Sequence, residues 1–241
     1  MRVTDPSRTV SRACHGISAA ASYWENELKC HPDRDFADRI IDFVRNGARI
    51  GVESEVSNKV LPNWPSAVKY KEGVYSYIEK HKASGAIQGP LEIANIDFRG
   101  SPLGAFEKVV NGKLRVIHDL SWPPGEAVND SIPKDSYTVQ YSTVHDAVKL
   151  ASKYPDIWFA KADLADAYLT CPVRFEDRHY LGFSWPNSQG IDESYWFSSL
   201  PLGLRSSARL FSDYTEALNF IAKKNGASDN TIFYLDDVLT I

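Results

Sequence analysis

The sequence predicts an α+β fold in which a helical N-terminal part precedes a part built from short strands and helices. Helical periodicity appears twice early in the chain, at about residues 34–46 and 66–85. From about residue 94, short apolar runs alternate with turn residues, as is typical of an antiparallel sheet backed by helices. Two further apolar runs, at 158–163 and 231–241, carry acidic residues at a strand end. We therefore predict an N-terminal helical segment and linker over 1–95, and a second part over 96–241.

Composition is ordinary for a soluble globular protein, with 43% hydrophobic and 24% charged residues in 241. No apolar run approaches the roughly 18 residues of a membrane span. The three cysteines, Cys14, Cys30 and Cys171, fit neither a metal spacing nor a disulfide framework, which favours a reducing, intracellular compartment. Arginines among the first serines faintly resemble a transit peptide, but Asp5 and the lack of amphipathicity argue against one.

The first helix is expected to begin after His31-Pro32-Asp33 and to end at Asn46-Gly47. Residues 57–66, rich in proline, are expected to form a linker. A second helix is expected from about residue 66 until Gly85 stops it, because apolar residues recur on one face. This half contains no residue constellation typical of catalysis.

A β-hairpin is predicted over 104–120, because Asn111-Gly112 separates two runs of alternating apolar residues. Lys108 and Arg115 can point to one side of that hairpin. A planar guanidinium suits bidentate phosphate contact, and an ammonium group acts as a point charge. The alternative is a surface hairpin with ordinary solvated basic residues.

Two predicted strand ends carry acidic residues that could hold a metal ion. The run 231–241 reads as a buried hairpin with Asp236 and Asp237 at its tip, and 158–163 reads as a strand that ends in Asp163. Two like charges about 4 Å apart repel by roughly 4 kcal/mol at an effective dielectric near 20, so a cation between them is expected. Short carboxylates suit Mg²⁺. If the strands pair, Asp163 and Asp236 form a two-metal site; the alternative is an exposed Asp-Asp turn.

The remaining segments connect these parts. Residues 122–141 are expected to be a loop, and Thr143 to open a helix that runs to about residue 153. An aromatic hairpin is expected over 179–198, where the rings pack as cross-strand pairs or, as an alternative, form a stacking platform for bases. Gly203 then permits a close backbone approach before a helix over about 206–224.

Three motifs in order carry a resemblance to a known family. They are Asp163-Leu164-Ala165-Asp166-Ala167-Tyr168, Leu200-Pro201-Leu202-Gly203-Leu204 and Tyr234-Leu235-Asp236-Asp237, which together resemble the palm of a reverse transcriptase. The resemblance implies a right-hand polymerase with fingers and an incomplete palm. It covers 96–241 well and 31–95 loosely. The Arg115-to-Asp119 spacing matches the fingers of the family, and the stretch Ser121–Asp130 resembles the DIRS-type retrotransposon branch.

The resemblance also implies roles for individual residues in an RNA-directed DNA polymerase. It implies two Mg²⁺ ions, with Mn²⁺ as a substitute, held by Asp163, Asp236 and the Leu164 backbone carbonyl, with Asp237 as a weaker ligand. Contacts to the incoming deoxynucleotide (dNTP) are implied for Lys108, Arg115, Tyr168, Leu202 and Gly203. Contacts to an RNA or DNA template-primer are implied for Arg205, Arg209 and Tyr234. Asp166 is expected to be a helix-start residue or a sugar-side contact, not a metal ligand.

Tyr168 is the residue that the family places under the sugar of the nucleotide. A ring there leaves no room for a 2′-hydroxyl, so it favours DNA synthesis and disfavours the alternative of an RNA-templated RNA polymerase. The other interpretation is that Tyr168 is one more buried aromatic side chain.

Several features depart from the family or complicate the assignment. Ser121, Ala208 and Arg209 stand where relatives often have arginine, proline and a small residue. The net charge of −4 means that any nucleic-acid groove must be local. The chain ends four residues after Asp237, so we expect a fragment of a longer polyprotein without its thumb. The alternative is a non-catalytic remnant of a retroelement with at most weak nucleic-acid binding.

Overall fold

The structure, a computed structural model, describes residues 21–109, 112–153 and 158–240. Its α-helices are α2 (Ala21–Leu28), α3 (Arg34–Asn46), α4 (Pro65–Lys69), α5 (Lys71–Ser84), α6 (Val144–Ala151) and α7 (Ser207–Lys224). Its strands are β1 (Lys59–Val60), β2 (Ile87–Gln88), β3 (Arg99–Gly100), β4 (Leu103–Glu107), β5 (Leu114–His118), β6 (Ala160–Asp163), β7 (Gly182–Pro186), β8 (Asp192–Phe197), β9 (Thr231–Tyr234) and β10 (Asp237–Thr240). Short 3₁₀ turns η2 (Val128–Ser131), η3 (Asp135–Tyr137), η4 (Ala167–Thr170) and η5 (Phe175–Leu181) join them. Helices combine with antiparallel strand pairs and, in one sheet, with two parallel pairs, β1–β3 and β3–β7, and this mixture confirms the α+β prediction.

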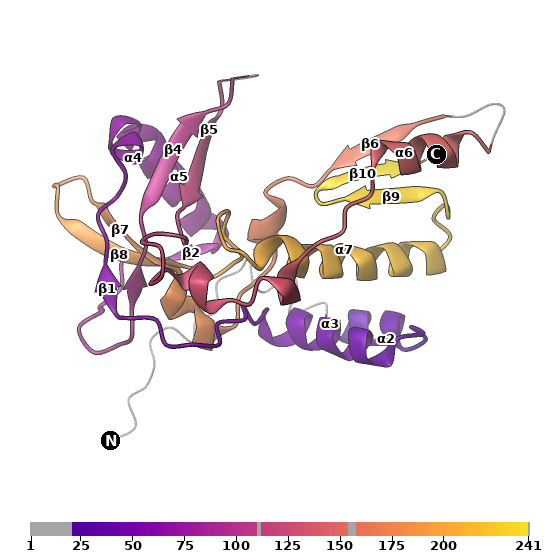
Figure 1. The fold of residues 1–241 in the computed structure, drawn as a ribbon, viewed down its shortest axis with the longest axis horizontal. Helices are drawn as coiled ribbons and strands as arrows, with labels where there is room; N and C mark the ends of the chain where they lie inside the picture. The colour runs from indigo at the N-terminus through magenta and orange to yellow at the C-terminus, as the bar shows by residue number, and fades with distance from the viewer. Residues whose placement is uncertain (1–20, 110–111, 154–157, 241) are drawn as a thin grey trace.

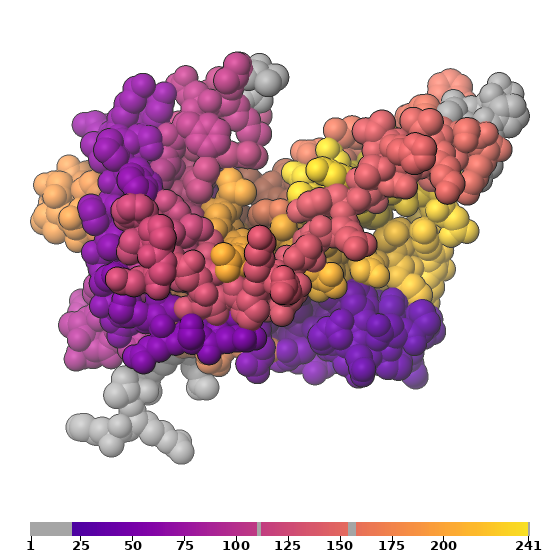
Figure 2. Space-filling view, viewed as in Figure 1, coloured from indigo at the N-terminus to yellow at the C-terminus, as the bar shows by residue number. Residues whose placement is uncertain are grey.

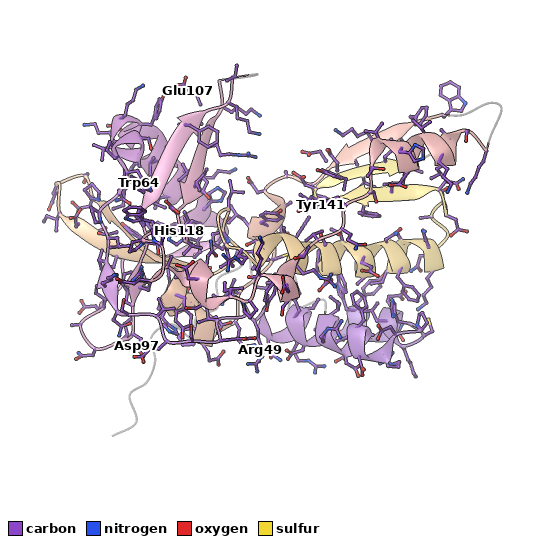
Figure 3. All side chains as sticks on the ribbon, in the orientation of Figure 1. Arg49, Trp64, Asp97, Glu107, His118 and Tyr141 are labelled. Carbon is purple, nitrogen blue, oxygen red and sulfur yellow. The ribbon has the colours of Figure 1, made fainter. Side chains whose placement is uncertain are left out.

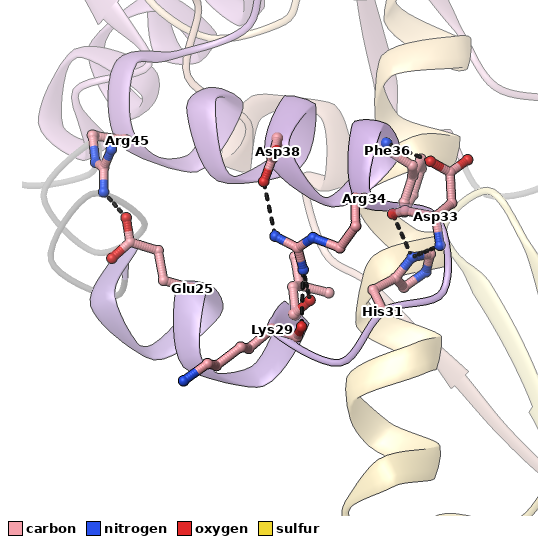
Figure 4. A network of polar contacts seen from close by, with 9 residues as sticks. Glu25, Lys29, His31, Asp33, Arg34, Phe36, Asp38 and Arg45 are labelled. Carbon is pink, nitrogen blue, oxygen red and sulfur yellow. Dashed lines mark hydrogen bonds and ion pairs between the residues drawn. The ribbon is translucent and has the colours of Figure 1, made fainter.

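Helix α3 begins where its cap residue predicts. The Asp33 carboxylate accepts a hydrogen bond from the Phe36 backbone N–H at 2.8 Å, which satisfies an otherwise free donor of the first turn. Arg34 ties this start to the end of α2 by donating to the Leu28 carbonyl at 2.8 Å, and Arg45 pairs with Glu25 at the other end (Figure 4). The helix buries an apolar face and ends at Gly47, as predicted.

The second predicted helix is two helices. Tyr70 ends α4 and also precedes α5, with φ −103° and ψ 33°, so the helical ladder breaks there. Val74 and Ile78 are fully buried on the inner face of α5. Gly85 ends α5 in the left-handed conformation, φ 80°, as the sequence predicts.

The largest sheet has five strands in the order β1-β3-β7-β8-β2. Two of its strands, β1 and β2, come from the segment before residue 96. Phe183 and Phe197 from β7 and β8 are fully or almost fully buried, with ring centroids 5.3 Å apart. The predicted aromatic hairpin is thus correct over 182–197, but residues 179–181 belong to the 3₁₀ turn η5.

The β4–β5 hairpin stands beside this sheet with Phe106 opposite Arg115. Lys108 N–H donates to the Lys113 carbonyl at 2.9 Å as the strands approach the turn. Gly112 has φ 65°, as a tight turn requires. Asn111, the other half of the predicted Asn-Gly turn, lies outside the described residues.

A second sheet, three-stranded in the order β6-β10-β9, lies on α7, and α7 in turn lies on α2 and α3 (Figure 1). The expectation of a buried hairpin is wrong here. All four residues of β6 are exposed, β10 is half-buried, and Tyr234 at the end of β9 is exposed. Helix α7 packs against β9 of this sheet, while the side chains of β6 remain open to solvent. No helix in the described ranges is both long and apolar enough to cross a lipid bilayer.

Candidate active site

The predicted acidic residues meet at one end of the three-stranded sheet. Asp237 on β10 is the register partner of Asp163 on β6, and the two strands run antiparallel. Beyond that pair, the Leu164 backbone N–H donates to the Asp236 carbonyl at 2.9 Å. Leu235, in the turn between β9 and β10, adopts a left-handed φ of 53°, which is uncommon for a branched residue. This strained turn holds Asp236 at the tip of the sheet, next to the strand end that carries Asp163.

The acidic side chains differ in their surroundings. Asp163 and Asp236 are exposed. Asp237 is half-buried, and its carboxylate forms an ion pair with the Lys161 ammonium group at 2.9 Å. Asp237, followed by Asp163 and Asp236, raises the pKa of the Lys161 ammonium group. Lys161 therefore partly neutralises the acidic tip.

Within the described part of the chain, no three acidic, histidine or cysteine side chains already converge as a ready-made metal cage. Asp163 and Asp236 nevertheless line the same open cleft and offer only oxygen donors. Mg²⁺ is typically held by one or two carboxylates, with waters and substrate phosphates completing its octahedral shell. The donor set therefore fits this ion better than it fits zinc, which prefers nitrogen and sulfur ligands in closed sites.

The cleft has a volume of about 500 Å³ and lies between the β4–β5 hairpin and the β6–β10 strands (Figure 2). Seven residues predicted from the sequence line it: Lys108, Arg115, Asp163, Leu164, Tyr168, Leu202 and Asp236. The hairpin supplies the predicted cations Lys108 and Arg115, and the sheet end supplies the predicted carboxylates Asp163 and Asp236. Such an arrangement can bind a polyphosphate between basic groups on one wall and a carboxylate-bound cation on the other.

Tyr168 enters the cleft from η4. Its ring meets Phe211 of α7 edge-on, with centroids 5.2 Å apart, so it is braced from behind. Partial burial raises the pKa of its hydroxyl to about 12, with nearby Asp236 adding to the shift. The ring is therefore a neutral, fixed wall of the cleft.

Gly203 lies in close contact with the backbone of His118. A Cβ at this position would lie 1.9 Å from the His118 carbonyl oxygen, and φ is 116°. The Gly203 carbonyl accepts from Asn129 at 2.8 Å, and the Leu202 carbonyl accepts from the His118 N–H at 3.1 Å. The loop that carries Leu202 is thereby fastened to β5 and η2.

Five predicted site residues do not line the cleft: Gly203, Asp237, Arg205, Arg209 and Tyr234. Arg205 donates to the Ile132 carbonyl at 2.7 Å and so anchors a loop. Arg209 pairs with Asp213 one turn along α7, at 2.9 Å. Tyr234 packs against Tyr141, with ring centroids 5.2 Å apart.

Residues that the sequence did not single out for the site also line the cleft, among them Tyr77 and Leu235, and Lys113 of the hairpin lines it as well. Asp166 lines it too, in a left-handed conformation with φ 51°, and its carboxylate pairs with Lys80 of α5 at 2.6 Å. Lys113 had a local signal, because it lies on the predicted basic hairpin. Tyr77 and Lys80 had none, because only packing brings α5 to this turn.

Comparisons with known proteins identify the family of this chain. The family model for reverse transcriptase (RNA-dependent DNA polymerase) matches residues 105–241, more than half of the chain. The Gag-Pol polyprotein of Walleye dermal sarcoma virus is 28% identical over 142 residues, which is 58% of this chain and 7% of that polyprotein. The Gag-Pol polyprotein of Avian reticuloendotheliosis virus is 24% identical over 181 residues, 73% of this chain and 14% of that polyprotein. The chain thus spans a small part of these curated relatives.

A solved structure supports the fold. The crystal structure of a Prototype Foamy Virus Protease-Reverse Transcriptase mutant aligns with 91% of this chain and 29% of its own, with a TM-score of 0.57 and 20% identity. The order of the strands, the acidic tip of the three-stranded sheet and the match over residues 105–241 lead to one conclusion. This chain belongs to the reverse transcriptase (RNA-dependent DNA polymerase) family.

Proposed function

We propose that this chain carries the fingers and palm of an RNA-directed DNA polymerase that adds deoxynucleotides to a primer 3′-hydroxyl. One observation carries the proposal: a single cleft brings Asp163 and Asp236 of the sheet opposite Lys108 and Arg115 of the hairpin. Members of the family are nucleotidyltransferases, and the cleft has the charges that such a transfer needs on both walls.

Asp163, Asp236 and the Leu164 carbonyl would hold two Mg²⁺ ions, or Mn²⁺ in their place, with Asp237 as a weaker ligand. When bound, such ions lower the pKa of the primer hydroxyl and neutralise charge on the reacting phosphate. The protein does the positioning: Lys108 and Arg115 would bind the triphosphate of the incoming nucleotide from the opposite wall. The Lys161–Asp237 ion pair leaves Asp163 and Asp236 as the two free carboxylates of the tip.

Tyr168 would select the sugar. Its ring is braced by Phe211 and cannot recede easily, so a ribose 2′-hydroxyl would be excluded by contact with it. Leu202 would border the nucleotide on the adjoining side, and Gly203 would serve it indirectly by docking the loop on His118. Arg205, Arg209 and Tyr234 are proposed to face the template or primer, outside this cleft.

We also propose a retroelement origin within the DIRS-type branch, from the stretch Ser121–Asp130 and from the looser resemblance of residues 31–95 to the segment that precedes the polymerase in that branch. The Gag-Pol relatives are much longer than this chain, which supports a larger polyprotein as its source. An intracellular setting is proposed from the cysteines: Cys30 and Cys171 are free thiols in the described part of the chain.

The test is primer extension on an RNA template with deoxynucleotides and Mg²⁺ or Mn²⁺. The wild type is expected to extend the primer and Asp236→Asn to lose extension. Asp229→Asn, an exposed acid in the loop before β9, is the matched control and should extend normally. Equal extension by wild type and Asp236→Asn would refute the assignment. No extension by any variant would support the alternative of a non-catalytic remnant.

A further inference from the structure

A second groove lies on the side of α7 that faces away from the three-stranded sheet. It has a volume of about 490 Å³, and α3, the segment after α3, η3 and α7 form its walls. Figure 1 shows α7 between this face and the sheet, and Arg49, which lines the groove, is labelled in Figure 3. The groove is therefore separate from the cleft that contains Asp163 and Asp236.

The groove has more positive than negative side chains. Its acids, Asp42 and Asp213, are both engaged, the first by Arg174 and the second by Arg209. Arg39 and Arg49 also line the groove and are exposed, and neither has a carboxylate ion-pair partner among the described residues. Arg39 lies over the Phe36 ring at 5.8 Å, which orients its guanidinium without neutralising it.

The floor of the groove is apolar and rigid. Ile40, Phe43 and Leu210 line it. Tyr137 of η3 is wedged against Gly51, where an added Cβ would lie 2.0 Å from its hydroxyl oxygen. Burial raises the pKa of the nearby Asp213 carboxyl in spite of Arg209 and Arg39, which indicates a partly water-excluded setting. Guanidinium groups above an apolar floor match a ligand with phosphates on one side and sugars or bases on the other.

One segment joins the groove to the active cleft. Leu202 lines the cleft, and Arg209, within the first turn of α7, lines the groove. The loop that borders the cleft therefore leads directly into the helix that borders the groove. The chain has a net charge of −4, so it needs such a local basic track to hold a polyanion.

We propose that this groove binds the phosphodiester backbone of a single-stranded nucleic acid, with Arg39 and Arg49 contacting phosphates. The proposal rests on the proposed function for the identity of its ligand. It extends nucleic-acid contact to the N-terminal helical segment, which otherwise has no assigned role.

The test is fluorescence anisotropy with a labelled single-stranded RNA 20-mer and no metal or nucleotide, repeated over a range of salt concentrations. Each lost phosphate contact is expected to reduce the salt slope, the change of log affinity with log salt, by about 0.7. Arg39→Gln and Arg49→Gln should each show this reduction, and the double variant should lose about 1.4. Far-ultraviolet circular dichroism and the thermal midpoint check that each variant is folded.

Arg45→Gln is the matched control, because Arg45 is an exposed arginine of α3 that pairs with Glu25 and does not line the groove. Arg45→Gln should bind RNA with the salt slope of the wild type. If its salt slope falls as much as that of Arg49→Gln, the effect comes from overall charge and not from this groove, and the proposal is overturned. Unchanged slopes in the double variant would also overturn it. Displacement of the RNA by inorganic phosphate or dTTP at low millimolar concentration, equally in wild type and Arg45→Gln, would indicate a site for a small anion instead. Primer extension by the same variants, measured in parallel, separates the two proposals: normal extension with unchanged salt slopes would overturn the groove alone, and lost extension by the wild type with reduced slopes in the variants would overturn the polymerase assignment alone.

Discussion

The two larger sheets of this chain differ in how deeply their side chains are buried. The five-stranded sheet buries Phe183 and Phe197 almost completely, and its role is to stabilise the fold. The three-stranded sheet leaves β6 exposed and places acids at its tip. The comparison teaches that burial and chemistry are separated in this molecule: mutations in the first sheet should affect folding, and mutations in the second should affect catalysis.

The largest expected effect tests that separation directly. Phe183→Ala should lower the free energy of unfolding by about 3–5 kcal/mol, because it opens a cavity in a closed core. Phe159→Ala, which removes the same ring from the exposed entry to β6, should cost less than about 0.5 kcal/mol. Urea unfolding followed by circular dichroism measures both. Similar losses in the two variants would break the comparison.

The next prediction uses pH. Burial lowers the pKa of His118 from 6.5 to about 4, since its ring stacks on Phe197 and is shielded from water. The neutral ring is favoured in the folded state, so its contribution to stability is complete above about pH 6.5 and is lost as pH falls toward 4. Between these values His118 should contribute a slope of up to about 1.4 kcal/mol per pH unit.

The His118→Phe variant should lack this slope in urea unfolding between pH 4.5 and 6.5. His145→Phe, at an exposed position of α6, should keep it. A wild-type slope that persists in His118→Phe would assign the acid sensitivity to other groups.

A third prediction concerns the loop that joins the two regions. Gly203→Ala should destabilise the protein by about 1–3 kcal/mol and also weaken primer extension, because the added methyl group meets the His118 carbonyl. Gly190 also has a positive φ, 78°, but nothing lies near its missing Cβ, so Gly190→Ala measures the cost of a positive φ without a steric contact. Equal thermal midpoints for the two variants would show that the contact with His118 does not matter.

A fourth prediction concerns Tyr168, the half-buried ring at the wall of the cleft. Tyr168→Ala should lower the preference for deoxynucleotides over ribonucleotides by about tenfold or more, which is about 1.4 kcal/mol of discrimination. The ratio of kcat/KM for dTTP and UTP in primer extension measures it. Tyr23→Ala, an exposed tyrosine of α2, is the control. Unchanged sugar discrimination would remove Tyr168 from the specificity assignment.

The smallest effect is expected at Lys161. Lys161→Met removes an exposed ion pair with Asp237 and should leave the thermal midpoint unchanged. It should modestly tighten Mn²⁺ binding, measured by electron paramagnetic resonance of the free ion, because a cation next to the carboxylates is gone. Lys149→Met on α6 should change neither value. Weaker Mn²⁺ binding in Lys161→Met would mean that the lysine organises the site.

Local rules account for much of the fold. Asp33 begins α3 through its own hydrogen bond, and Gly85 ends α5 through its own φ. The break at Tyr70 could not be predicted, because the periodicity of apolar residues continues across it. The exposure of β6 was also missed, since an apolar composition does not reveal how many layers cover a sheet.

The site divides in the same way. Asp163 and Asp236 could be placed together because each stands at the end of a recognisable strand. Arg209 could not be placed, because its position depends on how α3 packs against α7, and it lines the second groove instead of the cleft. The contact of Lys80 with Asp166 likewise depends on tertiary packing alone.

Asp163 and Asp237 are register partners on neighbouring strands, so the number of residues in each strand decides on which face these acids lie. Successive strand side chains alternate between the two faces of a sheet, so a single residue inserted within β6 would send Asp163 to the wrong face. An insertion in the loop between α7 and β9 would leave that phase intact. A library of single-residue insertions should therefore trace the borders of the three-stranded sheet, and length variation among natural versions of this chain should concentrate in that loop.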